Sequence, residues 1–232
     1  MTPAIVLDEV AVSVPTPDGD LAILRPTTLH LTERRIGLIG SNGSGKSTVA
    51  RLLNGLIEPT TGRVTVNGLD TVRAGAAVRR QVGFVFTDPS AQLVMPTCVE
   101  DIALSLRRTI KDKRQRTERA RAILERIGLA DKADTSVHAL SGGQKQMLAL
   151  AGVLATDPDI LVADEPTTLL DLRNTRLIAD QIFSLRQQVV LVTHDLELAE
   201  RCDRVLVVDD ARIVFDGAPV EAVRHYRALV DR

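Results

Sequence analysis

Apolar residues follow two patterns along the chain, and each pattern predicts a different kind of element. At both ends of the sequence, apolar residues alternate with polar ones or form short runs, as they do in β-strands. Such segments lie at residues 4–14, 21–31, 34–40, 62–68, 82–86, 159–164, 189–195, 204–210 and 212–217. The first two flank the turn-forming residues 16–20, which predicts an antiparallel hairpin at a sheet edge.

The middle of the chain follows the helical pattern instead. Apolar residues recur at intervals of three and four within residues 99–108 and 118–129. Strand segments on both sides of a helical insert predict one α/β core that carries a helical subdomain. The expected division is residues 1–88 with 156–232 for the core, including an N-terminal β subdomain, and residues 89–155 for the helical subdomain.

Composition narrows the class of protein without identifying it. The 232 residues are 44% hydrophobic and 25% charged, and their net charge of −1 provides no general attraction to nucleic acid or to an acidic membrane. Cys98 and Cys202 lie far apart without metal-binding spacing, which indicates buried, reduced thiols. The first ten residues lack a signal-peptide pattern, and the longest apolar run, residues 148–155, is far shorter than the ~20 residues of a spanning helix. We expect a chain that does not cross a membrane, although it could dock on a protein that does.

Basic residues are concentrated in residues 107–126. This segment has nine lysines and arginines against three acids, Asp112, Glu118 and Glu125. It has no aromatic residues for stacking on nucleobases, so a solvated helix face is favoured over a nucleic-acid or membrane-surface patch.

The sequence GSNGSGKST at residues 40–48 has the GxxxxGK[ST] pattern of a phosphate-binding loop. It lies between an expected strand and a helical segment, which is the context that such a loop requires. Its main-chain amides and the positive end of the following helix would attract phosphate. We expect Lys46 to reach the outer phosphates of a nucleotide and the Ser47 hydroxyl to bind Mg²⁺; a glycine-rich turn without a ligand is the weaker alternative. The nucleotide-binding residues predicted here are Gly40, Ser41, Asn42, Gly43, Ser44, Gly45, Lys46, Ser47 and Thr48.

Two adjacent acids, Asp164 and Glu165, end the apolar strand segment 159–164. Burying an ionised carboxylate is costly unless a cation compensates it, and Mg²⁺ would compensate Asp164. Glu165 would polarise a water in line with the terminal phosphate, and a positioned general base contributes typically ~10²–10⁴ in rate. Solvent exposure would explain the pair in a chain without a phosphate loop, but the loop favours the catalytic interpretation.

A second potential anion site lies at residues 140–144, with the sequence LSGGQ. Ser141, Gly142 and Gly143 stand at the start of an expected helix, where a hydroxyl and free amides face outward. An ordinary N-cap serine followed by glycines explains this segment equally well.

In order and over essentially the full length, these motifs resemble those of the ATP-binding subunits of ABC (ATP-binding cassette) transporters. Residues 40–48 resemble the Walker A loop, and LSGGQ is the family signature. The sequence ILVADE at 160–165 resembles Walker B with its catalytic glutamate, and TTLLD, which ends in Asp171, resembles the D-loop. His194 in VTHD resembles the switch histidine.

The resemblance implies a P-loop NTPase (RecA-like) core with an antiparallel β edge and a helical ABC subdomain. It also implies ATP and Mg²⁺ as ligands, Ser47 and Asp164 as the metal-binding residues, and Glu165 and His194 as the catalytic residues. His194 would contact the γ-phosphate; taken alone, it would be a core residue satisfied by the main chain.

In that family two subunits bind head to tail and enclose two ATP molecules. Each ATP lies between the Walker A loop of one subunit and the signature serine and glycines of the other, which explains a second anion site. By this resemblance Gln92, Gln144 and Asp171 also belong to the nucleotide site. Closure of the dimer assembles the hydrolytic site, and hydrolysis reopens it.

Residues 86–106 resemble the corresponding stretch of energy-coupling factor (ECF) importers of vitamins and metals. Within that group, VMPT and PTTLLDLRN are most similar to the ATPases of biotin importers. The implied partners are a second ATP-binding subunit, a transmembrane coupling subunit and a substrate-binding membrane subunit, with no nucleic acid. The two ATP-binding subunits are expected to form a homodimer, with a heterodimer as the open alternative. The implied location is peripheral, at the cytoplasmic face of the membrane.

Several alternative functions remain open. A cobalt, nickel or other vitamin importer of the ECF type is the nearest one, and an exporter or membrane-remodelling ATPase is more distant. A soluble ABC ATPase acting on DNA or ribosomes is disfavoured because the chain has neither a long coiled-coil insertion nor tandem cassettes. A phosphate-loop kinase is disfavoured by the signature LSGGQ and by Glu165.

Two positions depart from the family pattern. Thr87 stands where the Q-loop glutamine normally follows the strand, and Gln92 matches a second glutamine of the ECF pattern. Near Val14, where many members stack adenine on an aromatic ring, the first hairpin has no aromatic residue. We therefore expect weaker ATP binding and poorer discrimination between ATP and GTP than in members with the ring.

Overall fold

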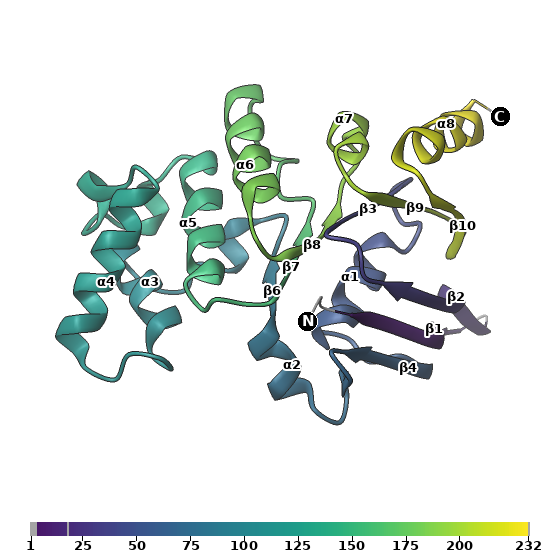
Figure 1. The fold of residues 1–232 in the computed structure, drawn as a ribbon, viewed down its shortest axis with the longest axis horizontal. Coiled ribbons are helices and arrows are strands. Elements are labelled where there is room, and N and C mark those ends of the chain that lie inside the picture. Colours follow the sequence, from purple (N-terminus) through teal and green to yellow (C-terminus); the bar gives the residue numbers. More distant parts are fainter. Residues whose placement is uncertain (1–3, 18, 232) are drawn as a thin grey trace.

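The computed structural model describes residues 4–17 and 19–231, which form two β-sheets and the helices around them (Figure 1). Asp18, in the expected hairpin turn, lies outside the described residues. The strands are β1 (Ile5–Thr16), β2 (Gly19–Leu31), β3 (Arg35–Gly40), β4 (Thr61–Val66), β5 (Leu69–Asp70), β6 (Val82–Val85), β7 (Ile160–Asp164), β8 (Gln188–Val192), β9 (Arg204–Asp209) and β10 (Arg212–Gly217). The α-helices are α1 (Lys46–Asn54), α2 (Gly75–Gln81), α3 (Cys98–Leu106), α4 (Lys113–Arg126), α5 (Gly142–Leu154), α6 (Leu172–Ser184), α7 (Leu196–Glu200) and α8 (Pro219–Val230). The short 3₁₀ helices are η1 (Pro89–Ala91), η2 (Ala130–Lys132) and η3 (Val137–Ala139).

The larger sheet has six strands in the order β10-β9-β3-β8-β7-β6. The strands β9, β3, β8, β7 and β6 pair in parallel, and β10 adds an antiparallel edge. Every residue of β3, β7 and β8 is buried, because helices or the second sheet cover both faces. This burial explains why their sequences are continuous apolar runs. The strand segments predicted for this sheet are confirmed.

The smaller sheet is antiparallel and has the order β2-β1-β4-β5. The predicted hairpin of β1 and β2 is confirmed, with Ile5 opposite Leu31 and Thr16 opposite Gly19, and β2 is an edge strand. Apolar side chains of this sheet, of α1 and of one face of the parallel sheet form a single buried cluster. Helix α1 therefore lies between the two sheets (Figure 1). The predicted α/β fold with an antiparallel β edge is confirmed.

The opposite face of the parallel sheet is covered by α6, α7 and α8 (Figure 1). Apolar residues of α5, α6 and α7 pack against β6, β7 and β8, while α8 packs against β3 and β9. Strand β3 leads at its carboxyl end into residues 40–48, and β7 leads at its carboxyl end into Glu165. The phosphate-loop segment and the acidic pair Asp164 and Glu165 therefore lie at the same end of the sheet.

Residues between η1 and α5 have a hydrophobic core of their own, made by α3, α4 and α5 at one end of the molecule (Figure 1). In α4 only Ala120, Ile123 and Leu124 are buried, and eight of the nine basic residues of segment 107–126 are exposed. The solvated helix face predicted for this segment is confirmed. The separate core supports the division that we propose, with residues 89–155 as a helical subdomain.

Two further expectations concern the cysteines and the membrane. Cys98 and Cys202 are buried free thiols, as predicted, and burial raises the pKa of Cys202 to about 12. Within residues 4–17 and 19–231, no helix has both the length and the apolar composition needed to span a bilayer.

Candidate functional site

The loop between β3 and α1 wraps closely because its glycines accept conformations and contacts that other residues do not. Gly40 has φ 150°, and a Cβ atom there would lie 2.0 Å from the main-chain oxygen of Val208. Gly45 has φ 110°, and a Cβ atom there would lie 2.7 Å from the main-chain oxygen of Ile23. The loop is thus held between strand β9 and strand β2 of the first hairpin, with α1 beginning directly after it at Lys46.

Lys46 is buried within this loop. Its Nζ donates hydrogen bonds to the main-chain oxygens of Gly40, at 2.8 Å, and Ser41, at 2.7 Å. Burial lowers the pKa of the Lys46 ammonium, and the charges of Glu165 and Asp164 act in the opposite direction. Both hydrogen-bond acceptors of Lys46 are neutral main-chain oxygens, so phosphate oxygens in the loop would form stronger, charge-assisted hydrogen bonds with its ammonium.

Ser44 provides an independent sign that the loop is built for a ligand. Its side chain is buried, and its Oγ has no hydrogen-bond partner among the described residues. An unsatisfied buried hydroxyl costs about 1–3 kcal/mol. A phosphate oxygen in the loop would accept this hydrogen bond. The other predicted residues lie around it, with Ser41, Asn42 and Gly43 exposed and Ser47 and Thr48 half-buried in the first turn of α1.

Asp164 lies at the end of β7, close to the first turn of α1. The Ser47 hydroxyl donates to its Oδ1 at 2.9 Å, and Arg51 Nη2 lies 3.9 Å from its Oδ2. The carboxylate side chain is only 3% exposed. Its pKa is raised above the ordinary value of an aspartate, because the effect of burial is larger than the opposing effects of Ser47, Arg51 and Lys46. Ser47 and Asp164 provide two hard oxygen ligands side by side, a donor set that fits Mg²⁺.

This pair alone does not make a complete metal site. Among the described residues, no cluster of three or more histidine, cysteine, aspartate or glutamate side chains could hold a metal. Mg²⁺ usually keeps several waters and takes further oxygens from substrate phosphates, so a site of two protein ligands fits a metal that arrives with a nucleotide.

Glu165 has a strained main chain and a fixed carboxylate. Its φ is 52°, and its N–H donates to the main-chain oxygen of Val192 at 3.0 Å. Its Oε2 accepts a hydrogen bond from the Thr168 hydroxyl at 2.7 Å and lies 2.7 Å from His194 Nδ1. Left-handed conformations of non-glycine residues cost about 1–3 kcal/mol and cluster at active sites. The side chain is thus aimed by contacts from two different loops.

The alternative of a core histidine at position 194 is wrong. His194 follows β8 with an exposed side chain, and its described contact is with Glu165 rather than with the main chain. The structure therefore brings together both residues predicted as catalytic.

The signature segment forms the amino-terminal end of α5. Ser141 is the N-cap: its Oγ accepts from the Gln144 N–H at 3.3 Å, and the Gln144 side chain accepts from the Ser141 N–H at 3.0 Å. Gly143 packs against Asn174 of α6, whose side chain donates to Asp171 Oδ2 at 2.9 Å. Asp171 in turn caps α6. The signature and D-loop residues therefore form one packed unit within the chain.

The signature segment and the phosphate loop are separate sites. Over the described part of the chain, no hydrogen bond or salt bridge joins residues 140–144 to residues 40–48. Helix α1 packs against one face of the parallel sheet, and α5 packs beside the other face. Each chain therefore has two separate candidate anion sites.

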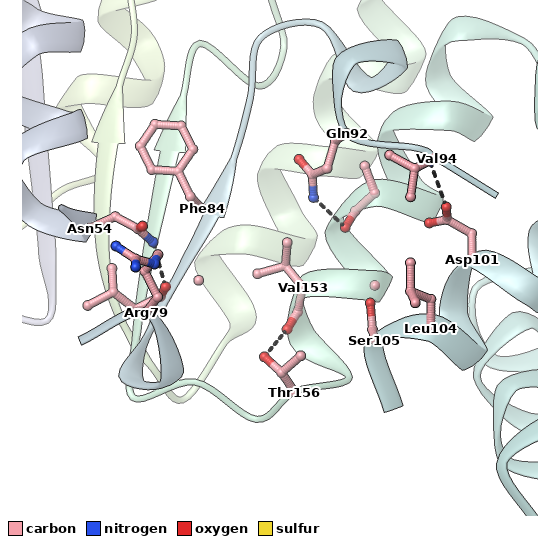
Figure 2. Close-up of a pocket in the computed structure, with 14 residues that line it drawn as sticks. Asn54, Arg79, Phe84, Gln92, Val94, Asp101, Leu104, Ser105, Val153 and Thr156 are labelled. Atoms are coloured by element: carbon pink, nitrogen blue, oxygen red, sulfur yellow. Dashed lines mark hydrogen bonds between the residues drawn. The ribbon is translucent and has the colours of Figure 1, made fainter. Parts of the chain in front are cut away.

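The two residues considered for the Q-loop position have different contacts. Thr87 donates its hydroxyl hydrogen to the main-chain oxygen of Asp164 at 2.8 Å. Gln92 accepts from the Phe86 N–H at 3.3 Å and donates to the main-chain oxygen of Ala149 at 3.3 Å (Figure 2). Thr87 is therefore in contact with the acidic end of β7, whereas both ends of the Gln92 amide are engaged elsewhere.

The first hairpin carries aliphatic residues near the phosphate loop. Val14 lies opposite Leu21, and both side chains are about half exposed, at 47% and 56%. The main chain of Ile23, two residues further along β2, contacts Gly45 of the loop. A base held here would meet aliphatic side chains rather than a ring.

A groove runs between the core and the helical region (Figure 2). Strand β6 and residues of α1 and α2 line one side, and α3 and α5 line the other. Val94 and Leu104, at 68% and 40% exposure, are apolar residues at the groove that face solvent. Figure 2 shows the Asp101 carboxylate accepting a hydrogen bond from the Val94 N–H and the Gln92 amide donating to the main-chain oxygen of Ala149.

Sequence reasoning missed three residues that contact the predicted ones. Arg51 could have been found because it is one helical turn after Ser47, so both side chains lie on one face of α1. Thr168 and Asn174 lie three residues after Glu165 and Asp171, a spacing at which side chains return to the same acid.

This fold, with its glycine loop, buried lysine and paired acids, defines a P-loop ATPase. A family profile described as "ABC transporter" matches residues 26–168, more than half of the chain. The chain belongs to the ABC transporter family, as an ATP-binding protein and an ATPase.

Similar proteins carry names from the same family. An ABC transporter ATP-binding protein of Bartonella henselae is 50% identical over 90% of this chain and 92% of that protein. The biotin transport ATP-binding protein BioM of Rhizobium etli is 46% identical over 91% and 94%. The energy-coupling factor transporter ATP-binding protein EcfA1 of Halalkalibacterium halodurans is 38% identical over 79% and 68%. The resemblance to ATPases of the ECF group is confirmed.

Two solved structures share the fold. CbiO1 of Clostridium perfringens is described as part of the ABC transporter complex CbiONQ. It matches with a TM-score of 0.80 at 26% sequence identity, and the match covers 98% of this chain and 93% of the CbiO1 chain. The ATP-binding cassette MJ0796, in a dimer bound to ADP and Pi, has a TM-score of 0.83 at 28% identity and covers 93% and 98%.

Proposed function

We propose that this chain hydrolyses ATP to drive an ECF-type importer, and that the imported compound is biotin. The observation that carries the ATPase part is the contact of Ser47 with Asp164, beside a Glu165 whose carboxylate is aimed by Thr168 and His194. The choice of biotin is supported by 46% identity to BioM over nearly the full length of both proteins.

In this proposal each residue of the site has a defined task. Lys46 and the loop amides bind the β- and γ-phosphates, and the Ser44 hydroxyl gains the acceptor that it lacks. Ser47 and Asp164 hold Mg²⁺, which when bound neutralises the charge on the phosphates. Glu165 accepts the proton of the attacking water. His194, which is exposed beside Glu165, hydrogen-bonds the γ-phosphate and keeps the carboxylate oriented.

The second anion surface is used in trans. We infer a head-to-tail dimer in which Ser141, Gly142 and Gly143 of each subunit face the ATP on the partner's phosphate loop, with Gln144 and Asp171 beside it. The separation of the two surfaces within one chain supports this, because one chain cannot bring both to the same phosphate. The dimeric state of MJ0796 with ADP and Pi is consistent with it.

The membrane partners would bind on the groove between the core and the helical region. Its exposed Val94 and Leu104 suit an apolar segment of a transmembrane coupling subunit, which would in turn bind the substrate-binding subunit. The chain would thereby be peripheral, at the cytoplasmic face of the membrane.

The ATPase assignment is tested with Glu165→Gln. Loss of the base should lower kcat by about 10²–10⁴ while ATP binding is retained, and the variant should accumulate as a dimer in ATP. Glu200→Gln, an exposed acid on α7, is the matched control and should behave as wild type. Turnover by Glu165→Gln at the wild-type rate would refute the assignment.

The transport assignment needs a separate experiment. The complex would be purified from membranes through this chain, and its companion subunits and bound small molecule identified by mass spectrometry. Biotin in that complex supports the proposal; cobalt, nickel or another vitamin would replace biotin, and recovery with ribosomes or DNA would overturn the importer assignment.

A further inference from the structure

The end of β6 is joined to the end of β7 by a side chain. Main-chain pairing of the two strands ends with Val85 opposite Ala163. Beyond that point the Thr87 hydroxyl donates to the main-chain oxygen of Asp164 at 2.8 Å. Thr87 therefore extends the strand pairing to the residue that carries the buried carboxylate.

Asp164 is consequently held at three atoms. Ser47 donates to Oδ1, Arg51 lies near Oδ2, and Thr87 holds the main-chain oxygen. The first two contacts act on the carboxylate itself and come from α1. The third fixes the main chain from which the carboxylate projects, and it comes from the segment that leads into the helical region.

The residue before Thr87 is clamped by two glutamines. Gln92, at the end of η1, accepts from the Phe86 N–H at 3.3 Å, and the buried Gln146 of α5 donates to the Phe86 oxygen at 3.3 Å. Gln92 also donates to Ala149 of α5 (Figure 2). Both polar main-chain groups of Phe86 thus bond to side chains of the helical region, and Thr87 is the next residue in the chain.

We propose that Thr87 is a positioning residue for Asp164, and that the Gln92–Gln146 clamp on Phe86 couples this position to the helical region. The proposal rests on the function proposed above and specifies how movement at the groove reaches the metal-binding end of β7. In this chain the link runs through the Asp164 main chain, since the Thr87 side chain is already bonded there.

The test uses the full-length chain and three threonine variants. Thr87→Val keeps the β-branched shape and removes the donor, whereas Thr87→Ser keeps the donor. Thr156→Val is the matched control because Thr156 makes a similar 2.8 Å bond to a main-chain oxygen, that of Val153 (Figure 2), but lies in the turn after α5 and not at the end of β7. ATP hydrolysis is measured against Mg²⁺ concentration, and ATP binding is measured in EDTA.

Loss of one hydrogen bond corresponds to roughly a five- to tenfold effect. Thr87→Val should raise the Mg²⁺ concentration for half-maximal hydrolysis by about that factor, and leave ATP binding in EDTA within about twofold of wild type. Thr87→Ser and Thr156→Val should match wild type. Gln146→Met, which removes the donor to Phe86, should change the Mg²⁺ dependence in the same direction.

The outcomes separate this inference from the function on which it rests. A Thr87→Val chain with wild-type Mg²⁺ dependence would overturn the inference alone. The inference would also be overturned if Thr87→Val weakened ATP binding in EDTA by the same factor as it changed the Mg²⁺ dependence, or if Thr87→Ser were as impaired as Thr87→Val. Both results would indicate general damage to the fold. A wild-type chain that neither binds nor hydrolyses ATP would overturn the proposed function and the inference together.

Discussion

The two adjacent glycines of the signature should respond differently to the same substitution. A Cβ atom at Gly143 would lie 2.4 Å from Cγ and Oδ1 of Asn174, closer than any tolerated contact. A Cβ atom at Gly142 would find its nearest neighbours, in Leu169 and Leu170, at 3.9 Å, which is ordinary van der Waals distance. Gly143→Ala should therefore destabilise the isolated subunit, and Gly142→Ala should not.

The loss of stability in Gly143→Ala follows from the contacts that the Asn174 side chain loses when it moves. Moving its side chain breaks the bond to Asp171 Oδ2, about 1 kcal/mol, and overpacking adds about 1–3 kcal/mol. The higher helix propensity of alanine returns up to about 1 kcal/mol. The net loss of roughly 1–4 kcal/mol in the free energy of unfolding corresponds to a Tm lower by about 2–16 °C for a chain of this size.

Thermal unfolding of the purified subunit without nucleotide is the assay. Gly142→Ala should unfold at the wild-type Tm or up to about 4 °C above it, since it lacks the steric conflict and gains the same helix propensity. The double variant Gly143→Ala/Asn174→Ala should be no less stable than Asn174→Ala, because the second change removes the clash. Equal Tm values for the two glycine variants, or a Gly143→Ala penalty that persists without Asn174, would refute the packing explanation.

Three further predictions concern the hairpin, the buried acid and the β9–β10 turn. Val14→Tyr should tighten ATP binding by up to ~1–3 kcal/mol, the contribution of one stacked base, and should tighten GTP binding less. Calorimetry measures both affinities, and an unchanged affinity for ATP would contradict the prediction. Burial raises the pKa of Asp164 in the folded chain, so without Mg²⁺ the folded chain loses stability as pH rises from the unfolded pKa through the raised folded pKa. Asp164→Asn should reduce the fall in Tm over this pH range. Wild type and Asp164→Asn losing the same Tm over the range would contradict the prediction. Ala211, whose N–H bonds to Ser44 O, has φ 60°, so Ala211→Gly should stabilise by about 0.5–1 kcal/mol in urea unfolding, and a lower midpoint would exclude strain there.

Much of the fold and part of the site could be predicted from local sequence. Buried strands such as β3 and β7 are continuous apolar runs, and the glycine loop with Lys46 lies between a strand and a helix. These features depend on residues close together in the chain, so composition and spacing reveal them. The family signature at residues 140–144 is likewise a local pattern, although its use depends on a second chain.

The contacts that aim the site could not be predicted in this way. The Thr87 bond to Asp164 spans 77 residues, and the Ser47 bond to Asp164 spans 117. Gly143 and Asn174 meet because α5 and α6 pack together, and His194 reaches Glu165 because β7 and β8 are neighbours. Sequence alone determined which residues carry charge, hydroxyl groups and tight turns, because these are properties of each residue and its neighbours. Tertiary structure alone decided which of them touch, because strand order and helix packing set the distances between segments that the chain keeps far apart.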